Sequence, residues 1–200
     1  MVKIDENNFN DLLDKCCETL SQSGVIIIPT ETVYGIICDA TNIEAVDKIY
    51  LTKGRSNTKP LQILMSSIIE AKKLAIFNKS AEKCAETNWP GALTIILPLA
   101  KNHNLASNFN SVNDTVGIRI PNSKFILRLL EKYPNPISAS SANISGQDAA
   151  DSPSSISEEL EQKVDLFLEG EKSKIGISST VVDYTDESKP VILRQGSVII

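Results

Sequence analysis

The sequence predicts an α/β domain built on a mixed sheet. Apolar residues recur at helical spacing in several segments, and short apolar runs typical of buried strands lie between them. The last strand segments follow one another without a helix, which a purely parallel sheet does not allow. With 200 residues, 42% of them hydrophobic, the chain can bury the core of one such domain.

Six segments have the periodicity of helices. In the first, Leu13, Cys16 and Leu20 share one face, and Gly24 follows as a stop signal. In the last, Ser155 and Glu158 have the spacing of a capping box. The expected helices cover residues 9–20, 43–52, 67–74, 80–88, 123–133 and 155–164.

Eight apolar segments are expected to be strands. The segment 25–28 is entirely apolar and is ended by Pro29. A polar loop at 101–114 joins the third strand to the fourth. The expected strands cover residues 25–28, 61–65, 93–97, 115–120, 136–139, 165–169, 179–184 and 191–194.

Composition excludes several classes of protein. The net charge is −5, whereas a general nucleic-acid binder needs clustered Lys and Arg. His103 is the only histidine, so a two-histidine metal site is excluded. The four cysteines lack the C-x-x-C spacing, and no signal peptide or run of about 18 apolar residues occurs, so we expect a cytoplasmic protein.

Polar residues interrupt apolar structure at residues 29–35, PTETVYG, directly after the expected strand 25–28. Ligands of open α/β sheets usually bind where strands end. A β-turn bounded by Pro29 and Gly35 explains the same residues without a ligand. The segment is therefore a candidate site whose function the residues alone leave open.

Three cations, Lys53, Arg55 and Lys59, lie within seven residues of an acidic chain. Arginine offers a bidentate fork to phosphate and lysine a point charge, so the cluster suits a polyphosphate. Cations also stabilise the carboxyl end of a helix, and the expected helix 43–52 ends here.

Two further segments point to an anion. Residues 138–146, SASSANISG, follow an expected strand with short hydroxyl side chains, and such loops bind phosphate through backbone amides. An ordinary Ser/Asn/Gly turn is the alternative. Arg119 lies in an apolar strand, where an arginine costs too much unless an anion pairs with it.

In their order and spacing, seven segments resemble the YrdC domain of threonylcarbamoyl-AMP synthases. They are PTETVYG, KGR followed by KPL, WPGALT, VGIRIP, SSANISG, SSTVVD and ILRQG, and the resemblance as a whole runs from Gly24 to Gly196. The resemblance is to the short bacterial form and implies one YrdC-like domain over residues 1–200, with a twisted mixed sheet, flanking helices and a concave ligand cleft. Ser56, Ala92, Ser140 and Gln195 replace prolines that are common in the family.

The resemblance implies a nucleotidyltransferase that joins L-threonine, bicarbonate and ATP into L-threonylcarbamoyladenylate and pyrophosphate, for modification of tRNA at position 37. Because carbamate and α-phosphate are both anionic, the enzyme must hold them in line and screen their charges. Lys53 and Arg55 are the implied catalytic residues. ATP binding is implied for Lys53, Asn57, Thr115, Ser141, Asn143, Ala149 and Arg194, and threonine binding for Thr30, Arg119, Ala139 and Ser179.

The resemblance implies Mg²⁺ bound through the ATP phosphates rather than by protein side chains, and no tightly bound cofactor. The implied downstream partner is the tRNA-threonylcarbamoyl transferase machinery, with no membrane. The main alternative is a nucleic-acid module that contacts tRNA or double-stranded RNA weakly through Lys48, Lys53, Arg55 and Lys59.

Other classes of enzyme are less consistent with the sequence. A serine hydrolase is disfavoured by the absence of G-x-S-x-G, and a P-loop or Rossmann enzyme by the absence of their glycine motifs. A carbamoyl-transfer module of the hydrogenase-maturation type shares the fold, but such modules usually lie within much longer chains.

Overall fold

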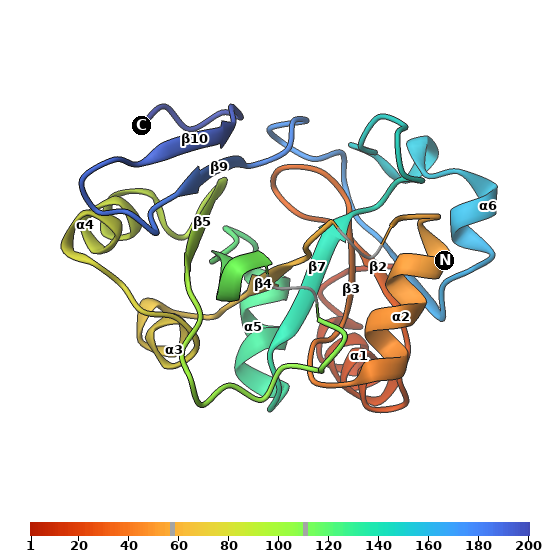
Figure 1. The fold of residues 1–200 in the computed structure, drawn as a ribbon. Helices are drawn as coiled ribbons and strands as arrows, with labels where there is room; N and C mark the ends of the chain where they lie inside the picture. Colours follow the sequence, from red (N-terminus) through yellow and green to blue (C-terminus); the bar gives the residue numbers. More distant parts are fainter. Residues whose placement is uncertain (57–58, 110–111) are drawn as a thin grey trace.

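A computed structural model of the chain describes residues 1–56, 59–109 and 112–200, and these form a ten-stranded mixed sheet flanked by helices (Figure 1). The strand order is β1-β8-β2-β3-β7-β4-β6-β5-β9-β10. Both parallel pairs, such as β4 with β6, and antiparallel pairs, such as β5 with β6, occur in it. The predicted α/β class and mixed sheet are confirmed.

Most strands lie within a residue or two of the segments expected from the sequence. β1 and β3 were not predicted. β1 has only two residues, and β3 directly follows the PTETVYG segment, which hid its pattern. The strands are β1 Val2–Lys3, β2 Ile26–Ile28, β3 Gly35–Asp39, β4 Gln62–Leu64, β5 Leu93–Pro98, β6 Thr115–Arg119, β7 Ile137–Ser141, β8 Leu166–Glu169, β9 Thr180–Asp183 and β10 Val191–Arg194.

Side-chain caps fix where several helices begin. Asn42, Ser67, Asn78 and Ser123 each accept a hydrogen bond from a backbone N–H of the first turn that follows. The helices are α1 Phe9–Ser21, α2 Ile43–Thr52, α3 Ile68–Leu74, α4 Lys79–Asn88, α5 Lys124–Lys132 and α6 Glu158–Glu161, with short 3-10 helices η1 Val112–Asp114 and η2 Pro153–Ser155.

The predicted helix over 155–164 is confirmed only for residues 158–161. The structure has η2 and then α6, a single turn. The predicted capping box of Ser155 and Glu158 is replaced by a pairing of Ser152 with Ser155, and Ser157 caps α6. Hydroxyl groups that bond to their own backbone compete with the helix, and this serine-rich stretch divides accordingly.

The sheet buries residues on both of its faces. In β2, Ile26 and Ile28 belong to a core cluster with α1 and α5, whereas Ile27 belongs to the cluster with α2, α3 and α4. This alternation is the period of two that a strand imposes. The α1–α5 cluster contacts β2, β3, β4, β7 and β8 but includes no residue of β5, β6 or β9. That part of this face is left open for the site.

Candidate anion-binding site

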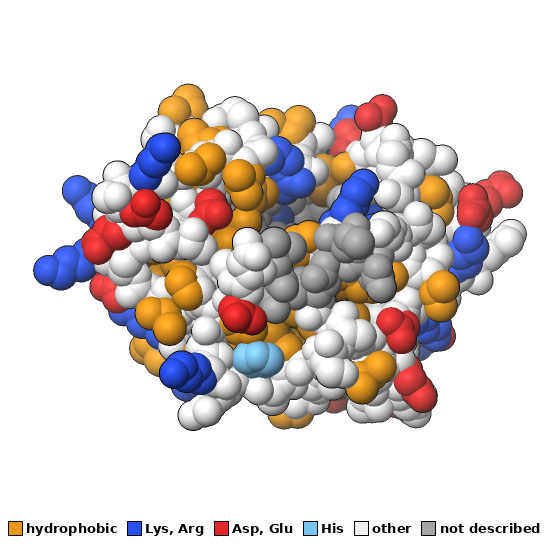
Figure 2. Space-filling view, viewed as in Figure 1, with side chains coloured by type: hydrophobic (Ala, Val, Ile, Leu, Met, Phe, Trp, Pro, Cys, Tyr) orange, Lys and Arg blue, Asp and Glu red, His pale blue; other side chains and the backbone are white. Residues whose placement is uncertain are grey.

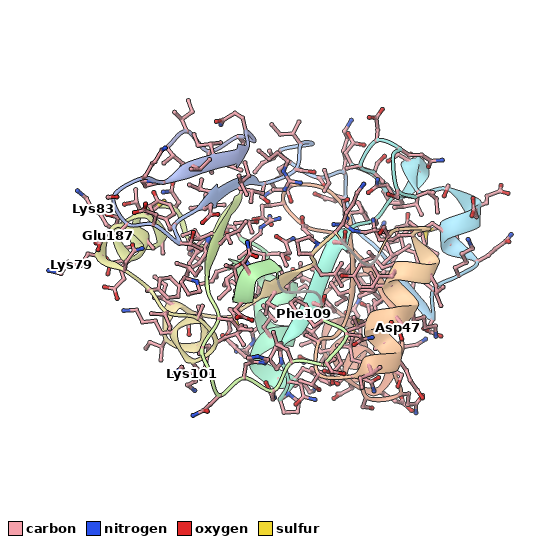
Figure 3. The ribbon with its side chains drawn as sticks, in the orientation of Figure 1. Asp47, Lys79, Lys83, Lys101, Phe109 and Glu187 are labelled. Carbon is pink, nitrogen blue, oxygen red and sulfur yellow. The ribbon has the colours of Figure 1, made fainter. Side chains whose placement is uncertain are left out.

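The central cavity lies on the face of the sheet that α1 and α5 leave open. Figure 2 shows basic side chains gathered in and beside a hollow in the upper half of the molecule. Lys79 and Lys83 lie on α4 at the left margin, outside the lining (Figure 3). The central cavity is lined by Thr32, Val33, Arg55, Pro60, Leu61, Gln62, Thr94, Ile96, Thr115, Gly117, Arg119, Ala139, Ser140, Ser141, Ser178, Ser179, Val181 and Arg194.

The pleat of β6 arranges three of these residues in a row. Thr115, Gly117 and Arg119 alternate with the buried Val116 and Ile118, so all three face the cavity. A Cβ atom on Gly117 would lie 3.3 Å from Cγ2 of Thr94. The missing side chain therefore opens the floor between the two polar residues of the strand.

Three guanidinium groups converge on the central cavity from distant parts of the chain: those of Arg55, Arg119 and Arg194. Burial first, and then the charges of Arg119 and Arg55, lowers the pKa of Arg194. No aspartate or glutamate belongs to the lining among the residues that the structure describes. The charge of the described lining is therefore positive, which suits an anion.

Arg119 is held in place by protein groups on one side. Its Nε donates to the Gly91 carbonyl (3.2 Å), and its Nη1 donates to Thr32 Oγ1 (2.9 Å). Its Nη2 lies 2.7 Å from Oε1 of Glu31, and both side chains are buried. Each terminal nitrogen carries two protons, so donors remain for a ligand. The sequence predicted that Arg119 needs an anionic partner, and the Glu31 carboxylate is one such partner.

Arg194 lies at the end of β10 and reaches back to β9. Its Nε donates to the Ser179 carbonyl (2.9 Å), and its Nη2 donates to Ser179 Oγ (3.1 Å). The next turn passes so close that a Cβ on Gly196 would lie 2.4 Å from the Ser178 carbonyl oxygen. Only glycine fits there, which explains the last residue of the ILRQG segment.

Arg55 is half-buried at the mouth of the cavity. Its Nη2 donates to the Pro60 carbonyl (2.9 Å), and its Nη1 lies 3.3 Å from Ser140 Oγ. Its Nε is buried and has no hydrogen-bond partner among the described residues. Burial lowers the pKa of Arg55. An anion bound here would be attracted more strongly than in water, because the cation is partly desolvated.

Lys53 lies behind the cavity wall. Its side chain is 1% exposed, and its ammonium donates to the carbonyls of Ser141 and Asn143 and to Asn143 Oδ1. Burial, with a smaller effect of Arg55, lowers its pKa from 10.5 to about 7. As placed, Lys53 shapes the 141–146 loop from behind and does not line the cavity.

The structure brings most of the predicted site residues together. Seven line the central cavity: Arg55, Thr115, Arg119, Ala139, Ser141, Ser179 and Arg194. Thr30 lines an adjoining side pocket, which shares Thr32, Arg119 and Ala139 with the central cavity. Lys53 and Asn143 lie behind the wall, Ala149 lines neither space, and Asn57 lies outside the described residues.

Sequence reasoning missed several residues of the site. Glu31 and Thr32 lie in the PTETVYG segment but were given no role, although they hold Arg119. Gln62 and Thr94 line the floor and are joined by a hydrogen bond of 2.8 Å. The one signal in the sequence is that Gln62 and Thr94 are polar residues in apolar strands. A polar side chain needs a hydrogen-bond partner when it is buried.

The basic cluster proposed for RNA is dispersed in the structure. Lys48 is 2.7 Å from Asp165, and Lys53 is buried. Arg55 faces the cavity, and Lys59 alone of the four described residues is exposed at the surface without these contacts. His103 is exposed. These positions give no continuous basic surface of the kind that nucleic-acid binding needs.

Two absences hold for the part of the chain that the structure describes. No group of three His, Cys, Asp or Glu is placed to hold a metal ion. None of the helices has the length and hydrophobicity of a membrane-spanning segment.

The fold and the site define an α/β protein with a cavity lined by three arginines on one face of a mixed sheet. The model of the Sua5/YciO/YrdC family, described as Telomere recombination, matches residues 18–196. The chain belongs to this family.

Three relatives illustrate the match. The chain is 36% identical over 180 residues to threonylcarbamoyl-AMP synthase of Pyrococcus abyssi, covering 90% of this chain and 52% of that protein. It is 34% identical to the Bacillus subtilis enzyme of the same name, covering 97% and 56%. A crystal structure of P. abyssi Sua5 complexed with L-threonine matches with a TM-score of 0.88 and 33% identity, covering 98% and 56%. The chain thus spans about half the length of the curated relatives it matches.

Proposed function

We propose that this chain is a nucleotidyltransferase that makes L-threonylcarbamoyladenylate from L-threonine, bicarbonate and ATP. The observation that carries the proposal is the convergence of Arg55, Arg119 and Arg194 on one cavity with no carboxylate in its described lining. Such a cavity suits a ligand with several negative charges, and the reaction joins a carbamate to a triphosphate. Support comes from two relatives named threonylcarbamoyl-AMP synthase, which are 36% and 34% identical to this chain.

The proposed chemistry has two steps. The threonine amine bonds to the bicarbonate carbon, and one water leaves, which gives a carbamate. A carbamate oxygen then bonds to the α-phosphorus of ATP, while the bond to the β-phosphate breaks and pyrophosphate leaves with its electron pair. Positioning and charge neutralisation supply most of the catalysis in such a displacement.

The cavity offers groups for each part of the reactants. Arg119, with the neighbouring Thr30, Ala139 and Ser179, is assigned to threonine, with the guanidinium on the carboxylate. Arg55 and Arg194 are assigned to the phosphates. Thr115 and Ser141 line the same wall and are assigned to the nucleotide, together with Asn57, Asn143 and Ala149. Lys53 remains assigned to the phosphates and would need its ammonium to turn away from the Ser141 carbonyl.

Mg²⁺ fits this site as a companion of the triphosphate. The cavity wall presents hydroxyls and guanidiniums, which leaves the ion to phosphate oxygens and water, as Mg²⁺ prefers. The ion supplies further neutralisation of phosphate charge. We place the activity in the cytoplasm, upstream of the machinery that transfers the threonylcarbamoyl group to tRNA, and within a single domain over residues 1–200.

The test is incubation of the purified chain with ATP, L-threonine, bicarbonate and Mg²⁺, with no RNA, and mass detection of the adenylate. We expect a threonine-dependent product and stoichiometric pyrophosphate. ATP turnover that does not depend on threonine, or binding of RNA without turnover, would contradict the proposal.

Filling the cavity floor should weaken ligand binding while changing the stability of the fold little. In Gly117→Val the new side chain would meet Thr94 and Gln62, since a Cβ alone lies 3.3 Å from Cγ2 of Thr94. We expect binding of L-threonine to weaken at least about tenfold, because the ligand space is occupied. Valine is more favourable in a strand than glycine, which offsets the cost of crowding. The free energy of unfolding should therefore change by less than about 1 kcal/mol. Calorimetric titration and thermal unfolding check the two halves.

A further inference from the structure

Gln62 occupies the middle of the cavity floor, and the roles assigned above leave it unused. It lies on β4, where it pairs with Ala139 of β7 on one side and Gly117 of β6 on the other. It lines both the central cavity and the side pocket. Its carboxamide is therefore in reach of any ligand that spans the two spaces.

A chain of hydrogen bonds holds this carboxamide with its oxygen towards Thr94. A guanidinium can only donate, so Ser179 Oγ accepts from Arg194 Nη2 (3.1 Å). Thr94 Oγ1 donates its one proton to Gln62 Oε1 (2.8 Å), so it accepts from Ser179 Oγ (2.8 Å). Because Oε1 is the acceptor at the end of the chain, the Nε2 amide is the free end. It has no hydrogen-bond partner among the described residues.

The position of Gln62 along the sheet indicates which part of the reactants it meets. Thr115, Gly117 and Arg119 face the cavity at successive steps of roughly 6.6 Å along β6. The proposed roles put the amino-acid carboxylate at Arg119 and the nucleotide towards Thr115. Gln62 pairs with Gly117, midway between them. The carbamate is the part of the bound reactants that joins these two ends.

We propose that the Nε2 amide of Gln62 binds the carbamate oxygens of the N-carboxylated amino acid and positions this group for attack on the α-phosphorus. The inference rests on the proposed function. An amide donates hydrogen bonds but carries no charge, so it holds the nucleophile without neutralising it as a fourth cation would. Gln62 neither gives nor takes a proton; the water and the pyrophosphate leave as described above.

The test compares Gln62→Leu and Gln62→Glu with the wild-type chain in steady-state formation of the adenylate. Leucine keeps much of the volume but has no donor, so the KM for bicarbonate should rise about tenfold, the loss of one hydrogen bond to an anion. Glutamate places a negative charge against the carbamate and should raise it further. Binding of L-threonine in bicarbonate-free buffer should stay within about twofold in the leucine variant, because Gln62 contacts the carbamate alone.

Two further variants control for indirect effects. Gln162→Leu makes the same exchange at an exposed position at the end of α6 and should leave both constants unchanged. Thr94→Val removes the donor to Gln62 Oε1 and leaves the amide itself, so it should raise the KM for bicarbonate less than Gln62→Leu does.

The outcomes separate the two proposals. An unchanged KM for bicarbonate in Gln62→Leu, with active wild-type protein, overturns the role of Gln62 alone. An equal loss of threonine binding in bicarbonate-free buffer also overturns it. If the wild-type chain forms no adenylate, the proposed function fails, and the role of Gln62 fails with it.

Discussion

Replacing Arg55 with alanine should lower the rate of adenylate formation by about 10²–10³-fold, the usual effect of removing one preorganised donor from a developing charge. Arg55 lines the cavity, and its buried Nε has no partner among the described residues. The Pro60 and Ser140 groups that it contacts both line the cavity, where water can replace the guanidinium. Release of pyrophosphate measures the loss, and the thermal unfolding midpoint should not change.

The matched control is Arg128→Ala. The Arg128 side chain on α5 is 63% exposed and pairs with Glu131, so its loss should affect neither activity nor stability. Near wild-type pyrophosphate release from the Arg55 variant would remove Arg55 from the phosphate site. A loss of activity that accompanies unfolding would point to a structural role.

The second large effect is expected in stability, from Lys53→Met. The substitution keeps an unbranched side chain but leaves the Asn143 carbonyl without a donor and the Ser141 carbonyl with the Asn143 N–H alone. An unsatisfied buried acceptor costs about 1–3 kcal/mol, and relief of the buried charge offsets part of this. We expect a net loss of about 1–3 kcal/mol in the free energy of unfolding, measured by urea denaturation. Activity should fall as well, because the 141–146 loop loses its support.

The same comparison has a pH dependence of defined sign. The pKa of Lys53 is lowered from 10.5 to about 7 on folding. Between these values the unfolded chain binds a proton that the folded chain does not, so the stability of the wild type rises with pH. Lys53→Met lacks this contribution. The stability advantage of the wild type should therefore be larger at about pH 8.5 than at about pH 6.5.

Lys48→Met serves as the control for this pH effect. Lys48 is 40% exposed and pairs with Asp165, so the variant should follow the wild-type pH dependence closely. If Lys53→Met also parallels the wild type between the two pH values, Lys53 is not the group that titrates.

The sequence predicted the elements that carry strong local signals. Side chains that cap α3 and α5, and apolar runs such as that of β2, need only neighbouring residues to be recognised. β3 was missed because its five residues follow a polar segment that drew a functional interpretation. The helix over 155–164 was predicted too long because serines at 152, 155 and 157 bond locally and divide the stretch.

The site was predictable where charge stood out from its surroundings. Arg55, Arg119 and Arg194 were all expected, and the structure places them around one cavity. Their partners were not, because pairing depends on contacts between distant segments: Glu31 with Arg119 is separated by 88 positions, and Thr94 with Ser179 by 85. Lys53 shows the limit most clearly, because composition marks a cation but not the direction in which its side chain points.

β10 differs from the other strands that the structure describes, because its apolar residues Val191, Ile192 and Leu193 are exposed and its only neighbour is β9. Few buried contacts resist its detachment, so its amide protons should exchange earlier than those of the central sheet. Arg194 is at its end. A ligand held by that guanidinium therefore ties the edge of the molecule to its interior, and part of the binding free energy appears as slower hydrogen exchange along residues 191–194.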